Sequence, residues 1–186
     1  MVYEPREDSF LLRDKVIEHF KGKKIKVSAD IGTGSGIIAL ALSGFSDKVL
    51  ACDIDEEALA AASKLTAQGN ASNVHVFKSD LFKDFPESLK GKCGLIVFNP
   101  PYLPMGEDDY YDESLHGGKK GVEVTIRFLE QARIFLSGNG IIFFVASSTS
   151  DIDLLERSLR EHKYSFKVVG KQHFFFEDIL IYKAWA

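Results

Sequence analysis

The chain has 186 residues, of which 45% are hydrophobic and 15 are phenylalanine, and this predicts a single domain over residues 1–186 with a substantial core. The formal net charge is −4 and lysine and arginine form no dense block, which argues against broad electrostatic capture of nucleic acid, although an average can hide a local basic face. No apolar run approaches the roughly 20 residues that span a bilayer, so we expect a soluble, cytoplasmic protein without a membrane partner.

Short apolar runs alternate with helical patterns along the chain. They predict strands at residues 25–31, 48–53, 74–78, 93–98, 141–146, 165–170 and 174–182, and helices at 36–43, 56–68, 122–136 and 151–162. The run at 93–98 is hydrophobic throughout, which indicates a parallel sheet covered by helices on both faces. Only residues 171–173 separate the last two strands, too few for a parallel crossover. The sequence therefore predicts an α/β fold with a mostly parallel, seven-stranded sheet and one antiparallel strand.

Cysteine and histidine indicate neither a disulfide nor a metal site. Cys52 and Cys93 lie at or beside predicted buried strands, which is typical of reduced core thiols. The five histidines are scattered without metal-ligand spacing. We therefore expect no metal centre and no catalytic histidine.

A glycine-rich turn at residues 30–36, Asp-Ile-Gly-Thr-Gly-Ser-Gly, follows the first strand and opens a helix. It departs from the dinucleotide-binding fingerprint, because position 37 is isoleucine and the third glycine comes one residue early. Asp30 would repel a pyrophosphate but suits a ligand that carries an ammonium and a sulfonium group. This favours S-adenosylmethionine, and the alternative is a turn that binds no ligand.

Acids also follow the next two predicted strands. Asp53 ends the second strand, where a carboxylate can accept two hydrogen bonds from a ribose diol, whereas Asp55 is expected to be the N-cap of the following helix. Asp80 follows the third strand and is placed to accept from an adenine amino group while Leu81 and Phe82 line the ring; the alternative is a surface carboxylate. Acids at the ends of adjacent parallel strands lie together at the edge where open α/β sheets bind ligands.

The segment Asn99-Pro100-Pro101-Tyr102 follows the apolar run at 95–98. Its two prolines fix the backbone and carry no N–H donor. It therefore presents the Asn99 side-chain oxygen and the Pro100 carbonyl as acceptors beside the Tyr102 ring. This predicts a site for an NH2 group on a planar conjugated system, and N-methylation as the chemistry; the alternative is an ordinary proline-rich turn.

Together these residues resemble those of class I S-adenosylmethionine-dependent methyltransferases. More narrowly, they resemble HemK-like protein N5-glutamine methyltransferases, the release-factor glutamine methyltransferases of archaeal and eukaryotic type. The resemblance covers nearly the whole chain and implies a single-domain Rossmann-like fold. Its specific parts are residues 3–12, residues 30–36, Asp53, Asp80, Leu81, residues 99–102 and the segment Gly-Gly-Lys-Lys-Gly-Val-Glu at 117–123.

The resemblance also implies a role for each matching residue. The cofactor-binding residues would be Ser9 at the methionine part, Asp30 and Gly32 around the ammonium, Asp53 at the ribose, Asp80 and Leu81 at the adenine, and in addition Gly34 and Asn99. Asn99, Pro100 and Tyr102 would be catalytic, and these three with Pro101 would bind the substrate amide. The implied reaction is methylation of the glutamine side chain in the Gly-Gly-Gln motif of a class I peptide chain release factor.

The family resemblance implies a partner as well, a small zinc-containing methyltransferase activator that adds a strand to the sheet edge. Residues 74–77 are expected on the edge strand, where an unpaired apolar edge favours association; the alternative is an edge covered by a helix or loop. The long segment at 105–121 is typical of a lid or binding loop. Its acids at 107–113 either attract a basic protein substrate or form a solvated surface.

Three other functions are compatible with parts of the sequence. Adenine N6-methyltransferases acting on DNA or RNA use the same Asn-Pro-Pro-Tyr geometry on a flipped base, but this chain shows no recognition domain or basic stripe. A non-catalytic subunit that binds S-adenosylmethionine is disfavoured because the acceptor segment and the three cofactor acids are all present. A small-molecule methyltransferase is a third alternative, for which this acceptor segment is less expected.

Overall fold

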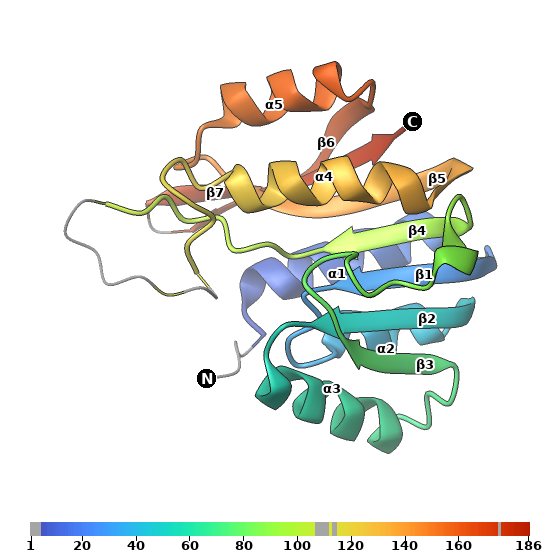
Figure 1. Cartoon of the computed structure of the whole chain (residues 1–186). Coiled ribbons are helices and arrows are strands. Elements are labelled where there is room, and N and C mark those ends of the chain that lie inside the picture. The colour runs from blue at the N-terminus through green and yellow to red at the C-terminus, as the bar shows by residue number, and fades with distance from the viewer. Residues whose placement is uncertain (1–4, 107–111, 113–114, 175) are drawn as a thin grey trace.

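A seven-stranded sheet forms the centre of the chain, and helices lie on both of its faces (Figure 1). The computed structural model describes residues 5–106, 112, 115–174 and 176–186. The strands are β1 (Ile25–Ile31), β2 (Ser46–Asp53), β3 (Val74–Lys78), β4 (Cys93–Phe98), β5 (Leu136–Ser147), β6 (Ser165–Phe174) and β7 (Glu177–Trp185). The helices are α1 (Glu7–Phe20), α2 (Ile37–Ser43), α3 (Glu56–Gln68), α4 (Glu123–Phe135) and α5 (Ile152–Glu161), with a short 3-10 helix η1 (Glu87–Leu89).

The strand order in the sheet is β3-β2-β1-β4-β5-β7-β6. Strands β1 to β5 pair in parallel, and β7 is antiparallel to both of its neighbours, β5 and β6. The expected mostly parallel sheet with one reversed strand is thereby confirmed. The chain passes from β1 outward to β2 and β3, then returns to place β4 on the other side of β1. Open α/β sheets bind ligands at such a switch point, beyond the carboxyl ends of the strands.

Neighbouring residues of the central strands face two separate cores. In β4, Ile96 and Phe98 belong to the core that includes residues of α4 and α5. Leu95 and Val97, which point the other way, belong to the core that includes residues of α1 and α2. Helix α3 packs beside α2 and against β2 and β3. A strand that is apolar on both faces is stable only when both faces are covered, which accounts for the continuous hydrophobic run in the sequence.

Several elements differ from the sequence-based expectation, among them β2, which begins at Ser46 rather than at 48, and β7, which spans Glu177–Trp185 rather than 174–182. Helix α1 was not predicted, although Leu12, Val16 and Phe20 recur every four residues and are buried. Strand β5 begins at Leu136, directly after α4, and is therefore longer than expected. The prediction of a turn at 171–173 is wrong, because these residues are part of β6 and pair with β7. Strand β6 lies at the sheet edge and is largely exposed. Its polar residues therefore contact solvent from within a strand, and their polarity does not indicate a turn.

Both cysteines are free and buried, as expected for core thiols. Burial raises the pKa of the Cys93 thiol to about 12 and that of Cys52 further still, so neither thiol is a ready nucleophile at neutral pH. Among the described residues, no group of three or more histidine, cysteine, aspartate or glutamate side chains is arranged to hold a metal ion. None of the described helices is long and apolar enough to cross a membrane.

The start of α2 disfavours any residue larger than glycine at position 36. Gly36 has a φ of 84°, and a Cβ atom added there would lie 2.7 Å from the Cα atom of Ala62 in α3. We expect Gly36→Ala to lower the free energy of unfolding by about 2–4 kcal/mol, from left-handed strain and overpacking together. Denaturation in urea measures the loss.

Gly22→Ala is the matched control for this substitution. Gly22 has a φ of 74°, but a Cβ atom there would meet nothing within 4 Å. Its replacement should therefore cost only the backbone strain, about 1–2 kcal/mol. Equal losses in the two variants would contradict the close packing of α2 on α3.

Candidate active site

The parallel register brings the predicted site residues to one edge of the sheet. Ile31 of β1 pairs with Cys52 of β2 and with Phe98 of β4. The residues that follow these three positions, Gly32, Asp53 and Asn99, therefore emerge side by side. Ser9 comes from α1, and its hydroxyl reaches the same edge through a hydrogen bond with Asn99.

Asp30 is buried at the carboxyl end of β1, with only 1% of its surface exposed. Its Oδ2 atom accepts hydrogen bonds from the Thr33 hydroxyl at 2.6 Å and the Ala39 backbone N–H at 3.0 Å. Its Oδ1 atom is buried and has no hydrogen-bond partner within the described ranges. Burial raises the pKa of this carboxyl group to about 7, although the two hydrogen bonds oppose the rise. A nearby cation would favour the ionised form.

The glycine turn after β1 directs backbone N–H groups toward the end of β2. Gly34 adopts a φ of 52°, which favours glycine, and its N–H donates to the Asp53 Oδ2 atom at 2.9 Å. The Thr33 N–H donates to the Cys52 carbonyl at 2.9 Å. At Gly32, an added Cβ atom would lie 3.0 Å from the Phe98 ring. The turn is thereby fixed against both β2 and β4.

Asp53 is held by backbone donors on both of its carboxylate oxygens. Gly34 donates to Oδ2, and the Asp55 N–H donates to Oδ1 at 3.1 Å. Each oxygen of a carboxylate can accept more than one hydrogen bond, so both remain able to accept from a diol. Asp55 accepts from the Glu57 N–H at 2.9 Å and caps α3, which confirms its predicted role as an N-cap.

The residues after β3 lie partly at the surface and partly in the core. Asp80 forms an ion pair with Arg127 of α4 at 3.0 Å, and both side chains are about half exposed. Leu81 is buried with a φ of 51°, and its carbonyl accepts from the Ser79 hydroxyl at 2.8 Å. The Phe82 ring stacks on Phe135 in the core, with ring centroids 5.0 Å apart. Leu81 and Phe82 both belong to the core that includes residues of α4 and α5.

The acceptor segment 99–102 is tied to the first turn of α1. The Asn99 Nδ2 atom donates to Asp8 Oδ2 and to the Ser9 hydroxyl, each at 3.1 Å. The Tyr102 hydroxyl donates to the same Asp8 oxygen at 3.1 Å. The Asn99 Oδ1 atom is buried and accepts no hydrogen bond from the described residues. The Pro100 carbonyl likewise receives no hydrogen bond from them.

A loop at 115–123 packs against the acceptor segment and supports it. The Leu103 N–H donates to the Leu115 carbonyl at 2.9 Å, and the Gly117 N–H donates to the Leu103 carbonyl at 3.0 Å. A Cβ atom at Gly121 would lie 2.4 Å from the Tyr102 carbonyl oxygen, which also accepts from the Ser150 hydroxyl at 2.6 Å. The loop thus leaves no room for the segment to shift toward it.

The Glu123 side chain closes this loop at the start of α4. Its carboxylate accepts from the Lys120 N–H at 3.0 Å and the Val122 N–H at 3.1 Å. The segment 117–123, noted in the sequence only for its family resemblance, is therefore a support for the acceptor segment. Sequence reasoning also missed the contacts of Asp8 and Ser150, because residues so far apart in the chain give no local signal of contact.

The polar groups of this edge fit S-adenosylmethionine. Within the described part of the chain, two buried side-chain oxygens lack a hydrogen-bond partner, Asp30 Oδ1 and Asn99 Oδ1. Buried polar atoms are almost always paired in native proteins, and an exception calls for a functional explanation. Asp30 offers a carboxylate to a cationic ligand, and Asp53, on the neighbouring strand, offers acceptors to a diol.

Some predicted features lie outside the described residues. These are Tyr3 and Glu4 of the N-terminal segment and, apart from Asp112, the acidic residues between 107 and 113.

The family model for the methyltransferase small domain matches residues 13–175. The chain belongs to this family. A protein of Methanocaldococcus jannaschii that carries the name protein N5-glutamine methyltransferase is 33% identical, over 99% of this chain and 91% of its own. Methyltransferase HEMK2 of Mus musculus is 31% identical over 86% of this chain and 78% of its own. The chain is a methyltransferase, and S-adenosylmethionine is its methyl donor.

The same fold occurs in solved structures. The E. cuniculi Mtq2–Trm112 complex, described as responsible for methylation of the translation termination factor eRF1, contains a chain with a TM-score of 0.78 to this methyltransferase. The two chains are 24% identical, and the match covers 99% of this methyltransferase and 98% of the other chain. The expected Rossmann-like methyltransferase fold is thereby confirmed.

The buried Asp30 predicts a pH dependence of donor binding by this methyltransferase. A cationic ligand group beside Asp30 lowers its pKa, so binding below the free value of about 7 must release a proton. We expect the Kd for S-adenosylmethionine to rise as the pH falls from 7.5 to 5.5, by up to about tenfold per pH unit below 7. Calorimetry in buffers of different ionisation enthalpy measures both the Kd and the proton release.

A Kd that stays constant over this range, with no proton released, would contradict the expectation that the ammonium group of S-adenosylmethionine binds beside Asp30. Asp47→Asn is a control for general charge effects, because Asp47 is exposed at the start of β2, away from the carboxyl edge. It should bind the donor with the same pH profile as the parent chain.

Proposed function

We propose that this methyltransferase modifies the side-chain nitrogen of a glutamine, in the Gly-Gly-Gln motif of a class I peptide chain release factor. Two lines of support come from the proteins it resembles. The Methanocaldococcus jannaschii relative is named for N5-glutamine methylation, and the E. cuniculi complex is described as acting on a translation termination factor. The third line of support is the acceptor segment itself.

The observation that carries the proposal is the orientation of the Asn99 side chain. A carboxylate at neutral pH can only accept hydrogen bonds, so the nitrogen of the Asn99 amide must be the atom that faces Asp8. The opposite atom, Oδ1, is then left buried with no donor from the described chain. A substrate NH2 group supplies the missing donor.

This arrangement addresses the main chemical difficulty of the reaction. The lone pair of a carboxamide nitrogen is delocalised into its carbonyl, so the nitrogen is a poor nucleophile. Hydrogen bonds from its two N–H groups to Asn99 Oδ1 and the Pro100 carbonyl orient the nitrogen and stabilise the positive charge that develops on it. The Tyr102 ring packs against the planar amide, and the supported segment 99–102 keeps the reacting groups aligned.

The donor is held by the residues on the adjoining part of the sheet edge. They are Ser9, Asp30, Gly32, Gly34, Asp53, Asp80, Leu81 and Asn99. S-adenosylmethionine supplies a sulfonium-bound methyl group, which is transferred to the nitrogen as the carbon–sulfur bond breaks. No strong base is needed beforehand, because the nitrogen becomes acidic as it is alkylated and then loses its proton to water.

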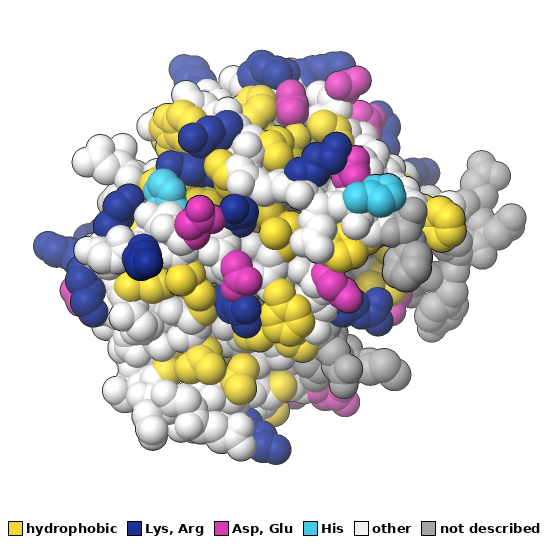
Figure 2. Space-filling model, turned by 180° about the vertical axis from the view of Figure 1, so that it is seen from behind, with side chains coloured by type: hydrophobic (Ala, Val, Ile, Leu, Met, Phe, Trp, Pro, Cys, Tyr) yellow, Lys and Arg dark blue, Asp and Glu magenta, His cyan; other side chains and the backbone are white. Residues whose placement is uncertain are grey.

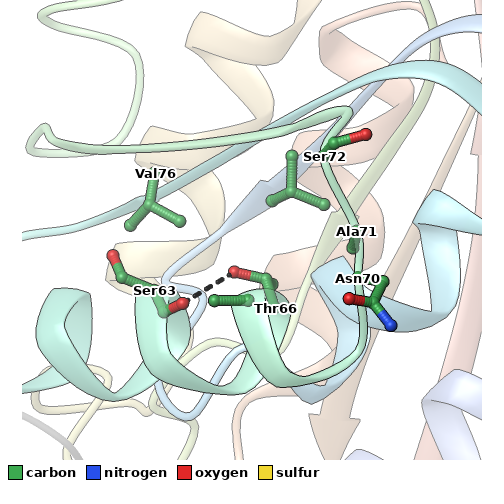
Figure 3. A pocket seen from close by; sticks show the side chains of 8 residues that line it. Ser63, Thr66, Asn70, Ala71, Ser72 and Val76 are labelled. Carbon is green, nitrogen blue, oxygen red and sulfur yellow. Dashed lines mark hydrogen bonds between the residues drawn. The ribbon is translucent and has the colours of Figure 1, made fainter.

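The outer edge of β3 supports the proposal of a partner. Strand β3 pairs only with β2, so its other edge has no strand beside it among the described residues. A hollow runs along this edge between β3 and α3 (Figure 3). It is lined by Ser63, Thr66, Ala67, Asn70, Ala71, Ser72, Val74 and Val76. An unpaired edge with valines beside it suits the addition of a strand from another protein.

The partner that we propose for this edge is the small zinc-containing methyltransferase activator. The E. cuniculi structure is a complex of the related chain with Trm112. In the present chain, Val74 and Val76 are only partly buried, and an added strand would cover them.

The surface gives no support to a nucleic-acid substrate on the face that is seen from behind. There, lysine and arginine side chains are interspersed with acidic and hydrophobic ones rather than gathered in one stripe (Figure 2). Adenine methylation is accordingly an outcome that the test of substrate must exclude.

The substrate is tested with labelled methyl donor and two acceptors, a release factor and an oligonucleotide. We expect label on the glutamine of the Gly-Gly-Gln motif, located by mass spectrometry. Asn99→Ala should lower kcat by about 100-fold or more, as for loss of a group that stabilises transition-state charge. Its Kd for the donor should change far less. Label on adenine and none on glutamine would overturn the substrate assignment.

The partner edge is tested with two substitutions on the same strand. Val76→Glu puts a charge into the hollow, and it should weaken binding of the activator at least about tenfold because an unpaired charge would be buried. His75→Glu adds the same charge to an exposed position of β3, and it should bind nearly as well as the parent chain. Calorimetry measures both affinities; equal effects would reject the proposed edge.

A further inference from the structure

The carboxylate of Asp8 is the centre of the hydrogen bonds behind the acceptor segment. Asp8 lies in the first turn of α1 and is 4% exposed. Its Oδ2 atom accepts from both Asn99 Nδ2 and the Tyr102 hydroxyl, each at 3.1 Å. Two side chains that we assign to the acceptor site therefore share a single oxygen of one buried residue.

The other oxygen of Asp8 is fixed by its own helix. Oδ1 accepts from the Ser9 backbone N–H at 2.6 Å, and the Ser9 hydroxyl lies 3.4 Å away. The free N–H groups at the start of a helix also favour a negative charge there. The carboxylate is thus held in place before any substrate arrives, and the Ser9 hydroxyl in turn accepts from Asn99.

We propose that Asp8 is a positioning residue that sets the direction and the acceptor strength of the Asn99 amide. This rests on the proposed function of Asn99. A free asparagine amide can turn over and exchange its oxygen and nitrogen. With nitrogen toward the site, Asn99 would present a donor to a substrate NH2, and both groups would be donors. The Asp8 carboxylate opposes that orientation, because the Asn99 oxygen would then face a negatively charged oxygen.

The same contact strengthens the acceptor. A hydrogen bond from Asn99 Nδ2 to a charged oxygen is stronger than one to a neutral group. Hydrogen bonds in a chain polarise one another in a medium of low dielectric. Donation to Asp8 therefore increases the negative charge on Asn99 Oδ1, at the atom toward which positive charge develops in the reaction. The Tyr102 hydroxyl, bound to the same oxygen, is held beside it.

The test compares Asp8→Asn with Asp14→Asn. Asp8→Asn keeps the volume but places an NH2 group where one of the two acceptor oxygens was, so it cannot satisfy Ser9 and Asn99 together. Misplacement of a reacting group by about 1 Å can cost about 100-fold in rate, and we expect kcat to fall by that order. The Kd for S-adenosylmethionine should change by a much smaller factor than kcat, because Asp8 contacts only two of the eight residues that we assign to the methyl donor, Ser9 and Asn99.

Asp14→Asn is the matched control, with the same substitution at an exposed carboxylate of the same helix that pairs with Arg13. Its kcat and Kd should equal those of the parent chain. If Asp8→Asn retains the kcat of this control, Asp8 is not a positioning residue. If its Kd for the donor rises by the same factor as its kcat falls, Asp8 is a ligand of the donor and the proposal is also overturned.

A second measurement needs no substrate. In a 15N-labelled parent chain, the side-chain NH2 of Asn99 should exchange slowly with water and show a downfield proton, since it is buried and bonded to a carboxylate. Asn99→Asp identifies this signal by its loss. A rapidly exchanging NH2 with ordinary shifts would contradict the inferred orientation. A wild-type chain that fails to label glutamine rejects only the substrate, because this spectrum does not depend on it.

Discussion

The hydrogen bond from the Asn99 amide nitrogen to the Asp8 carboxylate decides which atom of this side chain faces the active site. The nitrogen is bound to Asp8 and Ser9, and the oxygen is left without a donor. Everything that we propose about the reaction depends on this orientation. A hydrogen-bond acceptor beside the S-adenosylmethionine site favours a substrate that carries N–H groups. The rest of the fold places this amide and prevents it from turning.

The sheet provides the placement, and the helices and loops provide the restraint. Parallel pairing of β1 with β2 and β4 brings the donor residues and the acceptor segment to one edge. Helix α1 contributes Asp8 from one side, and Gly121 and Ser150 hold the Tyr102 carbonyl from the other. The prolines at 100 and 101 remove two N–H groups that would otherwise need partners there.

This arrangement costs stability. A buried polar atom without a partner costs about 1–3 kcal/mol, and the described chain has two, Asp30 Oδ1 and Asn99 Oδ1. At the S-adenosylmethionine site, the burial that raises the pKa of Asp30 reflects the same kind of cost, because it disfavours the charged carboxylate. Both costs are relieved when a ligand supplies a cation at Asp30 and a hydrogen-bond donor at Asn99. The site is thus organised for its ligands before they bind, at the expense of the free protein.

Much of the fold could be predicted from the sequence because its signals are local. The strands at 25–31, 74–78 and 93–98 were predicted with their observed bounds, since each is a short apolar run between turn residues. The prediction of a turn at 171–173 was wrong because an exposed edge strand carries polar residues as readily as a turn does. For the site, Asp30, Asp53 and Asn99 could be located because parallel strands end at a common edge.

The contacts of Asp8 could not be predicted in the same way. Asp8 and Asn99 are separated by 91 positions, and no pattern near either residue specifies that they touch. The support of Tyr102 by Gly121 and Ser150 is equally non-local. Such contacts depend on how α1 and the loop after β4 pack on the finished sheet.

A crystal structure of the chain with the demethylated methyl donor and a peptide containing Gly-Gly-Gln would show whether the Asn99 amide holds the substrate nitrogen. We expect the glutamine side-chain nitrogen about 3 Å from both Asn99 Oδ1 and the Pro100 carbonyl, with Asn99 Nδ2 still bonded to Asp8. A glutamine nitrogen held elsewhere, or an Asn99 amide turned with its oxygen toward Asp8, would contradict this expectation.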